Sequence, residues 1–242
     1  MSKVWLIAER ELSAYFKTWM GYFIVFAALL IDGLLFNSFA IGSKAKFSAD
    51  VLKDFFYFSS GIGMVAAVLL AMRLLAEEKQ NGTITLFYSS PVTERQIVYG
   101  KYLSSLIVFL ILQVISIYLP ALIFLEGKVS LGHLAAGYLG VSLLGASVLS
   151  ISLFSSIVTP NQLLAAVMGA SLTVILLLLW LVAGKVDEPF SSIFAYISIH
   201  NRRFGPFSQG IVHVRDLVFY ISLSLVFLEV SVRTLESRRM QG

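Results

Sequence analysis

The hydrophobic positions of the chain fall into six long runs that short polar segments separate. Each run can cross the ~30 Å hydrocarbon core of a bilayer as a helix, which takes about 20 apolar residues. The predicted spans are residues 20–42, 55–76, 102–125, 131–158, 163–184 and 214–235. Six spans place both ends of the chain on one side. The pattern therefore predicts an all-α integral membrane protein with a single transmembrane domain over residues 1–242.

A further helix is predicted over residues 1–19, before the first span. Its apolar residues recur at three-to-four spacing, and its polar residues fall largely on other faces. The two sets are Trp5, Ala8, Leu12, Tyr15 or Phe16, and Trp19 on one side, and Lys3, Glu9, Arg10, Ser13 and Lys17 on the other. This pattern is typical of an amphipathic helix that lies in the membrane interface. No signal-peptide cleavage site follows, so we expect the first span to stay in the mature protein.

The most polar interruption is "EEKQNGTITLFYSSPVTERQIVYGK", residues 77–101. Thr83 can cap a short helix, which should end near Ser89 because the residue before Pro91 disfavours the α conformation. Ile84, Phe87 and Tyr88 then share one apolar face that lipid or a partner protein must cover.

A second helix is predicted to begin just beyond Pro91. Thr93 and Gln96 have the spacing of a capping box, which satisfies the first amide groups of a helix. That helix should run through Gly100 and Lys101 into the third span. The short helix is thus held between two spans at one membrane face.

Composition agrees with a membrane protein. Hydrophobic residues make up 58% of the chain and charged residues 13%, where soluble domains have roughly 25% charged residues. The net charge is +4, but the 18 Lys and Arg are dispersed at the ends of the apolar runs, which favours lipid head groups over nucleic acid. Cysteine is absent, which excludes disulfides, thiolate metal sites and cysteine nucleophiles. His133, His200 and His213 lack metal-ligand spacing, so we predict no metal site and no catalytic residue.

Residues 77–101 resemble the segment between the second and third spans of ABC-2 family transporter permeases. In both, a charged cluster, Gly-Thr, a short apolar helix, Ser-Pro and Gly-Lys follow in that order. The resemblance implies that the short helix is a coupling helix that docks in a groove of a cytoplasmic ATPase subunit. The residues that it assigns to ATPase coupling are Glu77, Glu78, Gly82, Thr83, Ile84, Phe87, Tyr88 and Pro91. The chain departs from the family at Thr85, where a Glu is usual.

Two further stretches are similar to one subgroup of this family, associated with gliding motility and with maturation of copper enzymes such as nitrous-oxide reductase. They are "AERELSAYFKTWMGYFI" near the N-terminus and "FSQGIVHVRDLVFYISLSLVFLEVSVRTLESRR" near the C-terminus. In the second stretch Ser208, Gly210, Asp216, Tyr220, Ser222 and residues 235–239 match. The central spans match only in length and hydropathy.

The resemblance implies a permease subunit of an ATP-driven exporter in the bacterial cytoplasmic (inner) membrane, with both termini cytoplasmic. No G-x-x-x-x-G-K-[ST] loop occurs, so we expect ATP and Mg on a separate ATPase subunit and no cofactor and no enzyme activity in this chain. The expected partners are that ATPase, a second permease copy or paralogue, lipid, and an accessory membrane or extracytoplasmic protein. The alternative is a mechanotransmitter or anchor that relays the ATPase stroke without transport. The sequence does not name a substrate.

A Glu-Glu intramembrane protease is a rival interpretation of Glu77 and Glu78. That motif needs an Arg four residues after the second Glu, where Gly82 stands, and paired His on later spans, which are absent. The sequence also lacks a Ser, His and Asp set at membrane depth. The enzyme interpretation is therefore disfavoured.

Three other polar or amphipathic features invite a function. Asp32 lies within the first span, where a carboxylate must face protein or water, either as a structural hydrogen-bonded group or on the substrate path. Glu229 and Arg233 are four residues apart and can pair on one helix face. In the outer loop, residues 185–213, an amphipathic helix carries Phe190, Ile193, Phe194 and Ile197, which form either an outer gate or an interfacial anchor.

Overall fold

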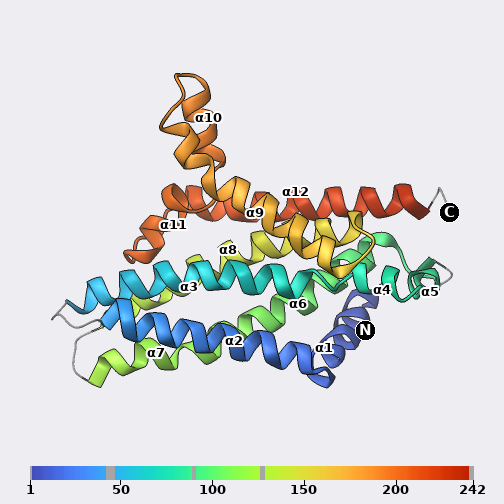
Figure 1. Cartoon of the computed structure of the whole chain (residues 1–242), viewed down its shortest axis with the longest axis horizontal. Coiled ribbons are helices and arrows are strands. Elements are labelled where there is room, and N and C mark those ends of the chain that lie inside the picture. The colour runs from blue at the N-terminus through green and yellow to red at the C-terminus, as the bar shows by residue number, and fades with distance from the viewer. Residues whose placement is uncertain (1, 42–46, 89–90, 126–128, 240–242) are drawn as a thin grey trace.

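A computed structural model describes residues 2–41, 47–88, 91–125 and 129–239 of the chain. Every regular element in these ranges is a helix, and six helices are long and apolar enough to cross a membrane. The predicted all-α architecture with six spans is therefore confirmed. Figure 1 shows the spanning helices side by side along the long axis, with both chain ends at the same end of the bundle.

The first three spans each include more than one helical segment. They are α2 (Trp19–Leu35) with the π-helix η1 (Phe36–Ile41), α3 (Ser48–Ala71) with α4 (Ala76–Gln80), and α6 (Glu94–Ser116) with α7 (Tyr118–Ala121) and the 3₁₀ helix η2 (Leu122–Leu125). The predicted capping box of Thr93 and Gln96 is confirmed at the start of α6. The second span begins at Ser48, earlier than the predicted residue 55, and the added turns contain polar residues such as Lys53 and Asp54, which a search for apolar runs leaves out.

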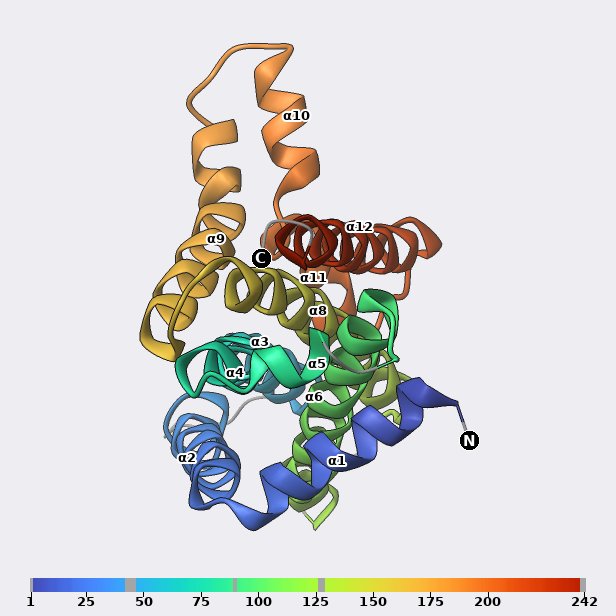
Figure 2. The same cartoon turned by 90° about the vertical axis from the view of Figure 1, so that its right-hand side faces the viewer.

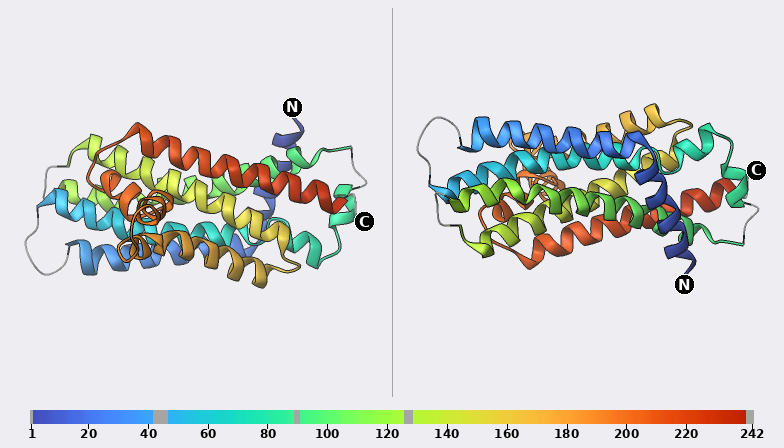
Figure 3. Two further views of the ribbon diagram at one scale, coloured as in Figure 1. Left: turned by 90° about the horizontal axis from the view of Figure 1, so that it is seen from above. Right: turned by 90° about the horizontal axis from the view of Figure 1, so that it is seen from below.

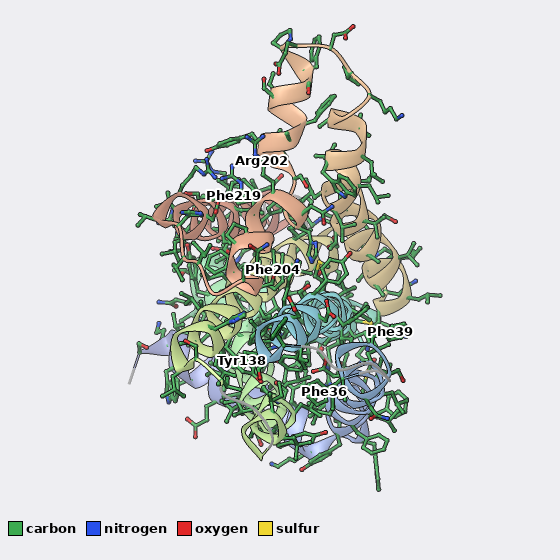
Figure 4. All side chains as sticks on the ribbon, turned by 90° about the vertical axis from the view of Figure 1, so that its left-hand side faces the viewer. Phe36, Phe39, Tyr138, Arg202, Phe204 and Phe219 are labelled. Atoms are coloured by element: carbon green, nitrogen blue, oxygen red, sulfur yellow. The ribbon has the colours of Figure 1, made fainter. Side chains whose placement is uncertain are left out.

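The last three spans are α8 (Leu131–Val158), α9 (Gln162–Ala183) and α12 (Val214–Arg239). The shorter helices are α1 (Lys3–Lys17), α5 (Ile84–Tyr88), α10 (Phe190–Ile197) and α11 (Asn201–Ser208), of which α11 was not predicted. In Figure 4, Phe36 of η1 is turned into the bundle, where it is 3% exposed, whereas Phe39 lies at its edge and is 53% exposed.

Helix α8 forms the centre of the bundle. In the apolar stretch of α8 that is long enough to span a membrane, 72% of the residues are buried, whereas the corresponding value for α9 is 17%. Glycines allow this close approach, because a Cβ on Gly145 would lie 2.2 Å from the Phe109 ring, and one on Gly137 would lie 2.2 Å from the Phe56 ring. The small side chains that the sequence places in this span are thus used to pack α8 against α3 and α6.

Helix α1 lies across the end of the bundle that carries both termini (Figures 2 and 3). Its contact face packs on α6, where Gly100 leaves room for Ile7, and Tyr15 donates a hydrogen bond to the backbone oxygen of Leu70 at 2.6 Å. Trp5 and Phe16 remain exposed on the other side. The helix therefore presents an apolar surface outward while it is fixed to the spans.

Helices α9 and α10 form a hairpin that projects sideways from the bundle (Figures 1 and 2). Helix α10 has no buried residue, although it is strongly apolar. The chain returns to the bundle at Ile199, whose amide donates to the backbone oxygen of Leu176, and continues into α11. Such an exposed apolar hairpin must be covered by lipid or by protein.

Candidate functional site

The segment predicted to couple to an ATPase lies at the same end of the bundle as the two termini (Figure 1). Gly82 ends the turn after α4 with a φ of +72°, a backbone conformation that favours glycine. The hydroxyl of Thr83, the residue that the sequence suggested as the cap of α5, donates to the side chain of Glu78 and closes the turn on itself.

Phe87 does not lie on an outward face of α5, which corrects the prediction that a partner covers it. Its ring is 7% exposed and is covered by the chain itself. The Arg10 guanidinium carbon lies 4.7 Å from the ring centroid and the Lys101 ammonium nitrogen 5.3 Å from it. Phe87 thus anchors α5 to α1 and α6 through cation–π contacts.

Beneath Phe87, one buried cation joins three helices. The side chain of Lys101 on α6 is 1% exposed, and its nitrogen lies 2.8 Å from a Glu11 oxygen on α1 and 3.5 Å from a Glu78 oxygen on α4. Arg10 also contacts both carboxylates. Burial raises the pKa of Glu11, but the neighbouring charges of Lys101 and Arg10 outweigh it and hold that pKa below its ordinary value of 4.5.

A second set of contacts ties the same segment to the start of α2. Glu77 accepts a hydrogen bond from Arg73 at 2.9 Å, and Arg73 also donates to the hydroxyl of Thr18. The Arg73 guanidinium lies over the ring of Tyr15. The two acidic residues that the sequence singled out, Glu77 and Glu78, therefore face cations of this same chain.

The remaining predicted coupling residues are less buried. Ile84 is half-buried against the core, and Pro91 is exposed and accepts a hydrogen bond from Lys3 through its backbone oxygen at 2.5 Å. Thr85 is exposed, and its hydroxyl donates to the backbone oxygen of Gly82. Tyr88 ends α5; its side chain lies outside the described residues.

Helix α4 is also fixed to the connection between α8 and α9. The Lys79 ammonium donates to the backbone oxygens of Ile157 and Thr159, and the Ser156 hydroxyl accepts from the amides of Leu75 and Ala76. A displacement of α4 must therefore move the base of α9 as well as α6. The sequence contained no signal for these contacts, since they join residues about 80 positions apart.

Asp32 is buried between α2 and α3. One of its oxygens accepts a hydrogen bond from the Ser59 hydroxyl at 3.2 Å, and the other has no partner among the described residues. Its neighbours Ala28, Ile31 and Leu35 line an apolar groove of about 540 Å³ between α2, α3 and α9. Asp32 itself does not line the groove and is buried beside the residues that do.

At the other end of the bundle a buried ion pair holds α11 on α12. The Arg203 guanidinium lies 2.8 Å from Asp216, and both side chains are at most 2% exposed. Tyr196 and Phe219 cover the guanidinium from two sides, at 4.3 and 4.4 Å. Figure 4 shows the labelled Phe204 inside the bundle, with Arg202 and Phe219 near its surface. Asp216 was noted only as a matching position, and Arg203 was not singled out.

The predicted gate residues lie on α10, the helix that also carries Tyr196. Phe190 and Phe194 stack with ring centroids 6.5 Å apart, and Ile193 and Ile197 are exposed beside them. Helix α10 begins after Pro189 without a side-chain cap. The apolar stripe thus forms one face of the projecting hairpin.

The three histidines are separate from one another. His200 is buried and contacts Ser60 and Asn201, His133 contacts the backbone oxygen of Ser208, and His213 is exposed before α12. The described residues contain no group of three or more His, Asp or Glu that could hold a metal ion. The predicted pair of Glu229 and Arg233 is present at 3.9 Å, although Arg95 lies nearer to Glu229, at 2.8 Å.

One family model matches the chain. It describes an ABC-2 family transporter protein and covers residues 17–235, from the end of α1 into the last turns of α12. No curated protein matches. The match covers far more than half of the chain and includes all six apolar spans. The chain is therefore a multi-pass membrane protein that belongs to the ABC-2 family of transporter proteins.

Proposed function

We propose that this chain is the permease subunit of an ATP-driven exporter in a bacterial cytoplasmic membrane, with both termini in the cytoplasm. It pairs with a second permease copy or a paralogue, and separate ATPase subunits bind ATP and Mg. The observation that carries the proposal is the contact of one buried cation, Lys101, with Glu11 of α1 and Glu78 of α4. Family membership supports the same role.

In this mechanism the ATPase docks on the end of the bundle formed by α1, α4 and α5. The exposed groups there include Thr85 and Pro91, and Ile84 is half-buried beside them. Because Phe87 is buried beneath Arg10, it transmits the load inward rather than filling a groove in the ATPase. Tyr88 remains a proposed contact of the ATPase.

From this surface the displacement has two routes into the spans. Gly82 and Thr83 connect α5 to Glu78, whose contact with Lys101 leads into α6. Glu77 contacts Arg73, which leads to the start of α2 through Thr18. Both routes consist of charged contacts at the membrane face, where a displacement of α4 changes their distances at once.

The groove between α2, α3 and α9 is the proposed position of the second permease and of the substrate path. The exposed apolar side chains of α2 and α9 flank it, and these two helices are less buried than α3 between them. Asp32 supports the wall of this groove through Ser59.

The docking proposal can be tested by co-expressing the chain with its ATPase subunit. Thr85→Trp adds bulk to an exposed position of α5 and should reduce co-purification of the ATPase at least tenfold. Ala49→Trp adds the same bulk at an exposed position near the opposite end of α3 and should leave it unchanged. Wild-type recovery of the ATPase with Thr85→Trp would exclude docking at α5. Phe87 is a poor test position because it is buried.

The alternative function, a mechanotransmitter without transport, is favoured by α10. An apolar helix without a buried residue offers a docking surface to an extracytoplasmic or membrane accessory protein. Phe190→Ser with Phe194→Ser should abolish the phenotype of the complex while insertion and ATPase binding persist, on either the gate or the docking interpretation. Transport of substrate into reconstituted vesicles that lack any accessory protein would exclude the mechanotransmitter. Normal function of the double variant would leave α10 as an interfacial anchor.

A further inference from the structure

A second apolar groove, of about 360 Å³, lies on another side of the bundle between α6, α8 and α12, with Val4 of α1 at one end. Its walls include Tyr99 and Leu103 of α6, Ala146 of α8, and Ile221 and Leu225 of α12. Ile221 and Leu225 are half exposed, at 50% and 51%, so the groove opens sideways, toward the hydrocarbon of a surrounding membrane.

The polar groups of this groove are already satisfied within the protein. The Tyr102 hydroxyl donates to the backbone oxygen of Ala146 at 3.1 Å, and the Ser224 hydroxyl donates to the backbone oxygen of Tyr220 at 2.9 Å. What remains is an apolar lining without an open hydrogen-bonding position, which suits a hydrocarbon chain and disfavours a polar solute.

The end of the groove nearest the two termini is basic. Lys3 directly precedes the lining residue Val4 on α1. Arg95 lies one turn before Tyr99 on α6, and Arg233 lies two turns after Leu225 on α12, so each of these two arginines shares a helix face with a lining residue. Arg95 and Arg233 are 65% and 77% exposed. One acid, Glu229, contacts both arginines. Three cations and one carboxylate leave a net charge of +2 at this end.

We propose that the groove binds an anionic phospholipid of the leaflet that faces the two termini. One acyl chain occupies the apolar groove, and the phosphate lies against Lys3, Arg95 and Arg233. Basic residues at a membrane surface attract anionic lipid, and the three cations here come from three of the elements that line the groove. The site is separate from the groove between α2, α3 and α9.

A second copy of this chain fits the same surface less well. Two identical subunits related by a twofold axis would bring the same patch face to face, so these cations would oppose their own copies. Like charges opposed across an interface disfavour association. The phosphate of a lipid supplies the opposite charge, and the acyl chain of the same lipid matches the apolar lining of the groove.

The test is native mass spectrometry of the purified full chain in non-ionic detergent with added phosphatidylglycerol or phosphatidylcholine. The wild type should retain one phosphatidylglycerol per chain, with at least tenfold preference over phosphatidylcholine. Lys3→Gln with Arg95→Gln and Arg233→Gln should remove that preference. A matched control, Lys53→Gln with Lys185→Gln and Arg202→Gln, removes three exposed cations elsewhere and should keep it.

A groove-filling variant tests the acyl-chain part separately. Ala146→Phe should reduce retention of both lipids. If the Ala146→Phe protein does not fold, the charge variants above still test the proposal. Equal retention of the two lipids by the wild type, or an equal loss of preference in the control, would overturn the proposal. A different result would also overturn it. This is the case if the wild type is a dimer without bound lipid and the triple variant of Lys3, Arg95 and Arg233 is a monomer, because the surface would then be a subunit interface. None of these measurements involves an ATPase, so they are independent of the proposed export function.

Discussion

The ammonium nitrogen of Lys101 lies 2.8 Å from a carboxylate oxygen of Glu11, and the Lys101 side chain is 1% exposed. The two residues are 90 positions apart and come from α6 and α1. The amphipathic first helix is therefore attached to the third span by a buried charge, in addition to its apolar contacts. Since Glu78 shares the same cation, α1 and the segment around α5 cannot move independently.

Lys101→Met should destabilise the protein, because it removes the buried cation between the carboxylates of Glu11 and Glu78 and leaves them only the largely exposed Arg10. Breaking a buried ion pair costs about 3 kcal/mol or more. Thermal unfolding in detergent should show the loss, and adding Glu11→Gln should recover part of it. Arg95→Met removes an exposed partner of Glu229 and should cost at most about 1 kcal/mol. Equal effects of the two Met variants would show that Lys101 does not hold the helices together.

Gly145→Ala should destabilise the centre of the bundle. The new Cβ would lie 2.2 Å from the Phe109 ring, which is fully buried. Overpacking of this kind costs about 1–3 kcal/mol. The control is Gly61→Ala on α3, where no atom lies within 4 Å of the new Cβ and where helix propensity favours Ala. Unfolding of both variants should show a loss for the first and no loss for the second.

The stability of the protein should fall as the pH drops from 7.5 to 5.5, in part through His200. Burial lowers the pKa of His200 below its ordinary value of 6.5, so the folded state keeps the ring neutral. The unfolded chain takes up a proton near that ordinary value, and acid therefore favours unfolding, by up to about 1.4 kcal/mol per pH unit. His200→Gln should flatten this part of the pH dependence of Tm. An unchanged slope in the variant would contradict the assignment.

Labelling of single cysteines tests the proposed orientation, and the absence of native cysteine makes each label unique. Thr85→Cys on α5 should react with an impermeant maleimide only after the cells are opened. Ala49→Cys, at the opposite end of the bundle, should react on intact cells. Both positions are exposed in the structure, whereas Ser89, at the predicted end of the short helix, lies outside the described residues. The reverse pattern of labelling would place the termini outside.

The spans and the start of α6 could be predicted because their signals are local. A run of apolar residues has to be buried in lipid or protein wherever it lies, and the capping box of Thr93 and Gln96 needs only its own turn. The burial of Phe87 could not be predicted in this way. Its cover comes from Lys101 of the next span and from Arg10 of the distant helix α1, and a periodic pattern does not say what packs on an apolar face.

The outer region shows the same limit. The stripe from Phe190 to Ile197 predicted a short helix, which the structure contains as α10. Its sideways position depends on where α9 leaves the bundle, and the contact of Arg203 with Asp216 that holds α11 depends on tertiary packing. These properties arise from contacts between helices, and a single sequence does not show which helices are in contact.

The projecting hairpin has a mechanical consequence. Helix α9 is attached near Thr159, beside Lys79 of α4, and has 22 residues, about 33 Å at 1.5 Å per residue. A tilt of ~10° about that base would carry the far end of α9 by ~6 Å, since the arc grows with the length of the arm. Under the proposed function, the hairpin would act as a lever whose short side lies next to residues 77–101 and whose long side ends at α10. A small displacement at one membrane face would then become a large displacement near the other.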